Sequence, residues 1–200
     1  MRGRFIVIEG LDGAGTTTQV ERLVAALGAS GSVLATREPT DGPIGKLIRA
    51  VLGGAPAPDW LALPWLFAAD RADHLARKVE PALAQGVDVV SDRYYHSSLA
   101  YQSLTLPLAE VAALNRFRAP DLTIFVQVSV DTALSRIAAR GAALEIFETR
   151  ERLERIAAAY ADVLTMLAAR GERVVTVSGE GAIEHIAAEI VAAVQAVQRP

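Results

Sequence analysis

The sequence predicts an α/β fold, with a parallel five-stranded sheet that carries helices on both faces. Short apolar runs rich in β-branched residues alternate along the chain with longer segments whose apolar residues recur at helical spacing. This alternation is typical of a parallel sheet whose strands are connected through helices. The run at 122–128 is also apolar apart from Thr123 and Gln127, as expected for a central strand buried on both faces.

Each expected element follows from its own pattern. The strands cover residues 5–8, 32–37, 87–91, 122–128 and 173–177. The helices cover residues 19–28, 45–52, 59 to about 84, 97–103, 107–117, 131–139, about 149–169 and 182–197. Gly28 ends the first helix, and a loop rich in Pro and Gly follows the second strand. Asp59 is expected to cap the long third helix, with Pro64 near its first turn and Pro81 near its end.

The organisation of the chain predicts a single domain over residues 1–200. We find neither an internal repeat nor a linker, and the length suits one compact core. The segment at about 140–149 separates two expected helices and contains Gly141. It is long enough to act as a lid.

The composition excludes several classes of protein. A net charge of −3 argues against a surface that coats nucleic acid, which needs excess Lys and Arg. Without cysteine, disulfides and thiolate metal sites are absent. No apolar run reaches the roughly 20 residues that span a bilayer, so we expect no membrane partner. The N-terminus shows no secretion signal, and a cytoplasmic protein is the expectation.

The segment 9–18, directly after the first strand, has the layout of a phosphate-binding P-loop at 10–17. Gly10 and Gly15 occupy the two glycine places of the G-x-x-x-x-G-K-[ST] pattern, and Thr17 the hydroxyl place. The glycines let backbone N–H groups turn toward an anion, and Thr17 can ligate magnesium. A glycine-rich turn between strand and helix can also be only a tight connection, and that alternative stays open.

Thr16 stands where the P-loop pattern has lysine. A unit charge about 4 Å from another is worth roughly 4 kcal/mol at an effective dielectric near 20. Losing the lysine charge without compensation therefore lowers the rate on the order of a thousandfold.

Charged and polar clusters follow the ends of several expected strands. They are the P-loop, residues 37–39, residues 92–94 and the arginines around the expected lid, which are Arg136, Arg140, Arg150 and Arg152. Parallel sheets bind ligands beyond the carboxyl ends of their strands. We therefore expect these clusters to meet at one edge of the sheet.

This combination resembles the bacterial thymidylate kinase family, which transfers a phosphoryl group from ATP to dTMP. The resemblance covers nearly the whole chain and rests on residues 9–15, 36–39, 66–72, 91–102 and 119–123. The stretches at 66–72 and 91–102 are the specific ones. The resemblance implies a three-layer P-loop NTPase fold, a single nucleoside monophosphate kinase domain with an arginine-bearing lid, a role in dTTP synthesis, and a homodimer.

For the dTMP side, the resemblance implies that Phe67 stacks on thymine and that Arg71 contacts the base or the phosphate. Arg93, with Arg37 or Arg49, would bind the phosphate, and Tyr101 would lie against the deoxyribose. The implied substrate-binding residues are Arg37, Glu38, Arg49, Phe67, Arg71, Arg93, Ser97, Ser98, Tyr101 and Gln102. From the residues alone, Phe67 can equally be a core residue of its helix, and each arginine, Arg49 more readily than Arg93, a surface ion pair.

For the ATP side, the resemblance implies binding by Gly10, Leu11, Asp12, Gly13, Ala14, Gly15, Thr16, Thr17 and Thr18. Thr17 and Asp92 would hold the Mg²⁺ that accompanies ATP, and Asp12 would lie near it. The implied catalytic residues are Asp12, Arg93, Arg136 and Arg140.

Ala14 leaves the P-loop without a cation, as in the family branch that uses lid arginines. We therefore hypothesise that Arg136, Arg140 or Arg150 closes over the phosphates in place of the missing lysine. These arginines can instead be surface charges paired with Glu148, Glu151 and Glu154.

Two other functions remain open at this stage. Thr16 fits a degenerate family member, catalytically weak or inactive, that binds nucleotides but no longer turns over. A kinase for another nucleoside or nucleoside monophosphate is the other alternative. The histidines have no metal-ligand spacing and are expected to be structural or exposed, and Glu145 and Glu148 are expected on the lid surface.

Overall fold

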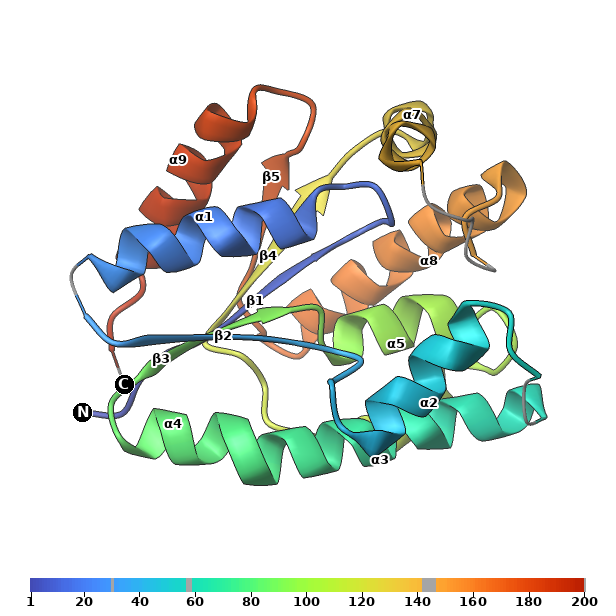
Figure 1. The fold of residues 1–200 in the computed structure, drawn as a ribbon, viewed down its shortest axis with the longest axis horizontal. Helices are drawn as coiled ribbons and strands as arrows, with labels where there is room; N and C mark the ends of the chain where they lie inside the picture. Colours follow the sequence, from blue (N-terminus) through green and yellow to red (C-terminus); the bar gives the residue numbers. More distant parts are fainter. Residues whose placement is uncertain (30, 57–58, 142–146, 200) are drawn as a thin grey trace.

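The computed structural model describes residues 1–29, 31–56, 59–141 and 147–199. Within these residues, five strands form one sheet in the order β2-β3-β1-β4-β5 (Figure 1). The strands are β1 (Phe5–Gly10), β2 (Val33–Arg37), β3 (Asp88–Asp92), β4 (Leu122–Gln127) and β5 (Val174–Ser178). All neighbouring strands pair in parallel. The prediction of a parallel five-stranded sheet is confirmed.

The central strand β1 is buried along its whole length, which explains its apolar composition. Its register places Ile8 opposite Asp92 of β3 and Gly10 opposite Val126 of β4. Arg37 of β2 is also opposite Asp92. The carboxyl ends of β1, β2 and β3 therefore meet at one edge of the sheet, which brings the P-loop beside residues 37 and 92.

Helices cover both faces of the sheet (Figure 1). On one face, α1 (Thr16–Gly28), α7 (Val130–Arg140) and α9 (Ile183–Gln195) bury apolar side chains against residues such as Ile6 and Ile124. On the other face, residues such as Val7 and Val89 lie in a second cluster with α5 (Tyr95–Gln102), α6 (Leu108–Leu114) and α8 (Arg150–Ala169). No helix in the described ranges is both long and apolar enough to cross a membrane.

The long helix expected from Asp59 is divided into several segments. A 3₁₀ turn (Trp60–Ala62) precedes α3 (Leu63–His74), a π-helical segment (Leu75–Val79) follows, and α4 (Glu80–Ala84) ends it. Asp59 caps only the initial turn, through the N–H of Leu61. Pro81 cannot donate a hydrogen bond to the preceding turn and its ring crowds that turn, so the helix widens before it. The short helix after β2, α2 (Pro43–Leu52), begins earlier than expected, at a proline.

A buried ion pair lies at the opposite side of the sheet, where β1 and β3 begin. Asp88 accepts hydrogen bonds from Arg4 Nη2 at 2.6 Å and from the Arg4 N–H at 2.8 Å, and Arg4 also donates to Val194 O in α9. The Asp88 side chain is 2% exposed. Although burial alone would raise its pKa, the hydrogen bonds from Arg4 hold the pKa of Asp88 below its ordinary value.

We expect Asp88→Asn to lower the free energy of unfolding at pH 7 by about 3 kcal/mol, because it leaves a buried guanidinium unpaired. A lowered pKa in the folded state means that the ion pair stabilises the protein above the ordinary carboxyl pKa and that this contribution is lost as the pH falls below about 4. Urea denaturation of both proteins at pH 7 and in acid measures the difference. If the unmodified protein and Asp88→Asn lost equal stability on acidification, the lowered pKa would not belong to Asp88.

Candidate active site

The P-loop is built where backbone must pass close to other backbone. A Cβ on Gly10 would lie 2.7 Å from Val126 O, and one on Gly13 would lie 2.4 Å from Ala133 O. Gly13 and Gly15 also have positive φ angles of 82° and 89°. Gly15 precedes α1 without a side-chain cap from the described residues. The first N–H groups of α1 therefore face the loop, in the arrangement that binds phosphate at helix N-termini.

Thr17 and Asp92 meet beside this loop, as the sequence predicted. Thr17 Oγ1 donates to Asp92 Oδ2 at 2.5 Å, and Asp92 Oδ1 is buried without a hydrogen-bond partner among the described residues. A hydroxyl and a carboxylate with spare acceptor capacity fit Mg²⁺, which prefers hard oxygen ligands and retains waters and phosphate oxygens. The described residues contain no cluster of three or more His, Asp or Glu placed to hold a metal.

Arg93 is the centre of a second group at the same edge. Its Nη2 donates to Asp12 Oδ1 at 2.6 Å, and its Nη1 donates to Gly10 O at 3.0 Å and to Ser97 Oγ at 2.9 Å. Tyr101 donates to the other oxygen of Asp12 at 3.0 Å, and its ring centre lies 5.5 Å from the guanidinium. Arg93 has a φ of 69°, a strained conformation for a residue other than glycine. The structure therefore joins Asp12, Arg93, Ser97 and Tyr101 into one unit.

The ionisation of this unit follows from its burial. Burial raises the pKa of the Tyr101 hydroxyl above its ordinary value, so this hydroxyl stays protonated and donates. Burial alone would lower the pKa of Arg93, but Tyr101 and then the Asp12 carboxylate raise it well above its ordinary value. The guanidinium is a permanent positive charge.

Arg71 is the centre of a third group of side chains, and this group is buried. Its Nε donates to Glu38 Oε2 at 2.8 Å, its Nη1 to Asn115 Oδ1, and its Nη2 to Ser98 Oγ at 3.1 Å. The other oxygen of Glu38 lies 3.0 Å from His74 Nδ1. Glu38 was expected to be a polar group of the substrate pocket, but its carboxylate faces Arg71 and His74 in this structure. Ser98 likewise contacts Arg71, and Gln102 donates to Ser98 Oγ at 3.4 Å.

Arg37 and Arg49 lie on the surface in ion pairs with the same residue. Their Nη2 atoms approach Asp41 Oδ1 at 2.7 Å and 3.1 Å, and Arg49 also donates to Pro39 O. The hydrogen bond from Arg37 lowers the pKa of Asp41. Both arginines pair with Asp41 in this structure, and their contact with phosphate stays a prediction.

The arginines around the expected lid have separate partners. Arg136 Nη1 donates to Ala14 O of the P-loop at 3.2 Å, and its Nη2 donates to Gly179 O at 2.8 Å. Arg140 pairs with Glu148 at 2.6 Å, and Arg150 pairs with Asp131 at 2.6 Å. Of these three, Arg136 is the one that the described structure places against the P-loop.

One expectation for the lid is wrong. Glu148 was expected on the lid surface, but it is 2% exposed. Its charge is held by Arg140, which explains how a carboxylate can be buried there. Glu145 and the rest of the expected lid at 142–146 lie outside the described residues.

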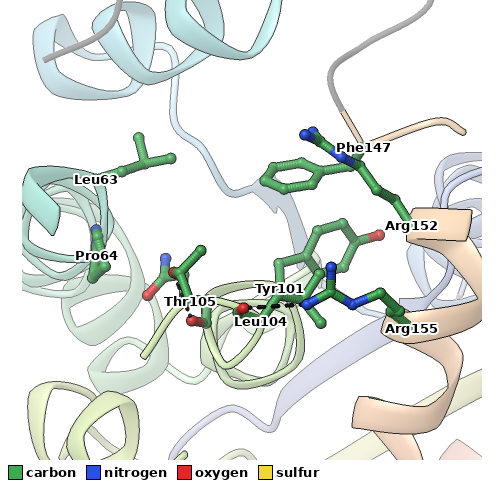
Figure 2. A pocket seen from close by; sticks show the side chains of 9 residues that line it. Leu63, Pro64, Tyr101, Leu104, Thr105, Phe147, Arg152 and Arg155 are labelled. Atoms are coloured by element: carbon green, nitrogen blue, oxygen red, sulfur yellow. Dashed lines mark hydrogen bonds between the residues drawn. The ribbon is translucent and has the colours of Figure 1, made fainter. Parts of the chain in front are cut away.

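Cavities adjoin these groups. One of about 410 Å³ is lined by Thr17, Asp92, Arg37, Asp73 and His74 among others. Another of about 210 Å³ lies between α3 and the start of α8. Figure 2 shows Leu63 and Pro64 on one side of it and Tyr101 and Phe147 on the other. The rings of Tyr101 and Phe147 meet edge to face at 5.4 Å.

Phe67 packs against a small core. It is partly buried against Ile48, Val51 and Leu63, between α2 and α3. Phe67 is therefore only partly buried on this core, and its stacking on thymine stays a prediction.

Sequence reasoning missed several residues of the site. Glu9 and Tyr160 contact the Arg93 group, and Asn115 contacts Arg71. Two of these residues stand out in the sequence: Glu9 is a single acid at the end of an apolar strand, and Tyr160 is a single aromatic residue after Ala157, Ala158 and Ala159. No sequence feature marks Asn115. The histidines are as expected: His74 and His96 are buried, and His185 is exposed and pairs with Glu189.

Comparison with known proteins agrees with this geometry. Residues 8–190 match the family model described as Thymidylate kinase. A probable thymidylate kinase of Pyrococcus horikoshii is 38% identical over 98% of this chain and 97% of its own length. Another probable thymidylate kinase, of Pyrobaculum calidifontis, is 40% identical over 96% and 95%, and the thymidylate kinase of Xanthomonas oryzae pv. oryzae is 42% identical over 80% and 71%. The match to the family model and these relatives show that the chain belongs to the thymidylate kinase family.

Proposed function

We propose that this protein transfers the γ-phosphoryl group of Mg-ATP to dTMP and so makes dTDP for dTTP synthesis. The observation that carries the proposal is the convergence of Asp12, Arg93 and Tyr101 with the Thr17–Asp92 pair at the mouth of the P-loop. Phosphoryl transfer needs little covalent help from the protein. Positioning of the two nucleotides and neutralisation of charge supply most of the rate.

On the ATP side, the main-chain N–H groups of residues 10–18 bind the phosphates. Thr17 and Asp92 hold Mg²⁺, which neutralises phosphate charge when it is bound. Arg136 supplies the cation that Thr16 lacks. Its contact with Ala14 O supports this choice over Arg140 and Arg150, whose charges are engaged by Glu148 and Asp131. This places the extra cation outside the P-loop, as in the bacterial type of the family.

On the dTMP side, Arg93 binds the phosphate through its planar guanidinium. Arg71 contacts the nucleotide. It is already fixed by Glu38, Asn115 and Ser98, so its side chain loses little conformational freedom when the nucleotide binds. Tyr101 faces the deoxyribose and leaves no room for a 2′-hydroxyl, and Phe67 and Gln102 complete the base site. Arg37 and Arg49 exchange Asp41 for phosphate when dTMP binds.

The test is a coupled assay of ADP release with dTMP, dUMP, dCMP and thymidine as acceptors. We expect turnover with dTMP and at least a tenfold preference for it over the other acceptors. Nucleotide binding without any turnover would favour the degenerate homologue. A preference for another acceptor would favour a different nucleoside or nucleoside monophosphate kinase.

The metal assignment gives a separate prediction. We expect Asp92→Asn to raise the Mg²⁺ concentration for half-maximal turnover about tenfold, because an amide oxygen binds the cation more weakly than a carboxylate. Asp73→Asn is the control, since Asp73 lines the same cavity but pairs with Arg77. Equal Mg²⁺ dependence of the two variants would remove Asp92 from the metal site.

We also propose one nucleoside monophosphate kinase domain over residues 1–200, working in the cytoplasm as a homodimer. Support for the dimer comes from apolar side chains exposed on α2, on the 3₁₀ turn and on α3. Leu47, Leu61 and Trp65 are 47%, 58% and 62% exposed. Exposed apolar side chains gathered on neighbouring helices are typical of a surface that a partner covers.

A further inference from the structure

Glu9 is a buried carboxylate in a strand that is otherwise apolar. It is 1% exposed and lies one residue before the end of β1. Burying a charge in this way is unfavourable unless hydrogen bonds compensate it. Both oxygens of Glu9 are engaged, and His96 Nδ1 lies 3.7 Å from one of them.

One oxygen of Glu9 holds the start of α5. Its Oε1 accepts from the N–H of Tyr94 at 2.8 Å and from the N–H of Ser97 at 3.2 Å. Tyr94, the residue before the first turn of α5, provides no side-chain cap of its own. Glu9 therefore takes the place of a capping side chain, and it does so directly after the strained residue Arg93.

The other oxygen orients the Ser97 hydroxyl, which contacts Arg93. Ser97 Oγ donates its proton to Glu9 Oε2 at 2.7 Å. A hydroxyl has one proton, so Ser97 can offer Arg93 Nη1 only a lone pair, and the two atoms lie 2.9 Å apart. The carboxylate thereby holds the Ser97 hydroxyl in place, with its proton toward Glu9 and its lone pairs free for the guanidinium.

Tyr160 connects the same oxygen to α8. Its hydroxyl donates to Glu9 Oε2 at 3.0 Å and lies 3.1 Å from Ser97 Oγ. Burial and then the Glu9 carboxylate raise the pKa of Tyr160 well above its ordinary value, so the hydroxyl keeps its proton. The ring packs on Phe125 at 4.9 Å between centroids, which fixes its position. Glu9 thus joins β1, α5 and α8 around Arg93.

We propose that Glu9 is a positioning residue for Arg93, acting through Ser97 and the start of α5, with Tyr160 as its fixed second donor. This inference rests on the proposed function, in which Arg93 binds the phosphate of a nucleoside monophosphate. Through Ser97 and the start of α5, Glu9 fixes the position of the guanidinium. It does not touch either nucleotide.

The experiment is a double-mutant cycle between Glu9→Gln and Arg93→Ala. Glutamine keeps the shape and the acceptor for the N–H groups, but its amide NH₂ cannot accept the hydroxyl protons of Ser97 and Tyr160, so the Ser97 hydroxyl loses its fixed orientation beside Arg93. We expect Glu9→Gln to raise the KM for dTMP about tenfold and to change the KM for ATP by less than about twofold. In the Arg93→Ala background, the same change is expected to alter kcat/KM by less than about twofold, since the group it orients is gone.

Controls separate positioning from general loss of structure. Asp121→Asn also alters a carboxylate that accepts a backbone N–H, from Phe5 at 2.7 Å, but at the opposite edge of the sheet. It is expected to lower thermal stability without a selective change in the KM for dTMP. If Glu9→Gln does not fold, Tyr160→Phe removes a single donor and is expected to raise that KM about threefold.

Equal effects of Glu9→Gln with and without Arg93, or equal increases in both KM values, would overturn the positioning role. Failure of the proposed function is distinguishable. If the unmodified protein binds dTMP without turnover, the kinase proposal fails and calorimetric binding of dTMP by the same variants decides the role of Glu9. If it prefers another monophosphate, the cycle is measured with that acceptor. If it binds no monophosphate, both proposals fail.

Discussion

Replacing Arg93 with alanine is expected to lower kcat/KM for dTMP by about a thousandfold, which corresponds to roughly 4 kcal/mol. Two charge-assisted hydrogen bonds to a phosphate are worth about 1.5–3 kcal/mol each, so their loss accounts for this value. The change also leaves Asp12 without the partner that now lies 2.6 Å away. Its free carboxylate would then repel the dTMP phosphate.

Steady-state kinetics with each nucleotide varied in turn measures this prediction. The KM for ATP is expected to stay within about twofold, because the proposed function assigns Arg93 to the monophosphate. Arg93→Lys keeps the charge but not the planar fork, so an intermediate loss is expected. Arg118→Ala is the control, since Arg118 pairs with Glu80 away from the P-loop. Equal losses for dTMP and ATP would place Arg93 outside the dTMP site.

Arg136→Ala is expected to lower kcat about a hundredfold, or roughly 2.7 kcal/mol. Arg136 is fixed between Ala14 O and Gly179 O, so its charge lies beside the P-loop, where the proposed function places the ATP phosphates. A charge near 4 Å contributes roughly 4 kcal/mol at a dielectric near 20, and partial exposure reduces that value. The cation matters more here than in a P-loop with lysine, because Thr16 supplies none.

Restoring the lysine tests whether Arg136 replaces it. In a Thr16→Lys background, the loss caused by Arg136→Ala is expected to shrink below about tenfold, because the two cations then serve the same phosphates. Arg140→Ala is the matched control, and its pairing with Glu148 predicts a smaller effect on kcat. Unchanged turnover in Arg136→Ala would exclude Arg136. Turnover that requires Thr16→Lys would show that no arginine compensates for the lysine.

Much of the fold could be predicted because it depends on local patterns. Apolar β-branched runs and helical spacing located every strand of the described sheet within about two residues. The P-loop also followed from its pattern, and parallel strands were expected to bring it to the same edge as residues 92–94, where Thr17 contacts Asp92 in the structure. The division of the helix after Asp59 was missed, since Pro81 had been taken only as an end signal.

The side-chain partners could not be predicted in the same way. Arg71 was expected at the substrate, but the sequence does not show that Glu38 and Asn115 would surround it. Glu148 looked like a surface acid until Arg140 was seen to cover its charge. In each case the decisive contact joins residues that are not neighbours in the sequence. No local sequence pattern encodes which of these residues come together in space.

The sequence alone determined the succession of strands and helices along the chain. It also determined the glycine-lined turn with threonine in place of lysine, and the gathering of charge at one edge of the sheet. They follow from periodicity, turn chemistry and the geometry of parallel sheets. The tertiary structure decided which arginine touches the P-loop and which side chains connect Glu9 to Arg93. The physical reason is that a buried charge is tolerated only where donors from several elements converge on it, and that convergence exists only in the folded chain.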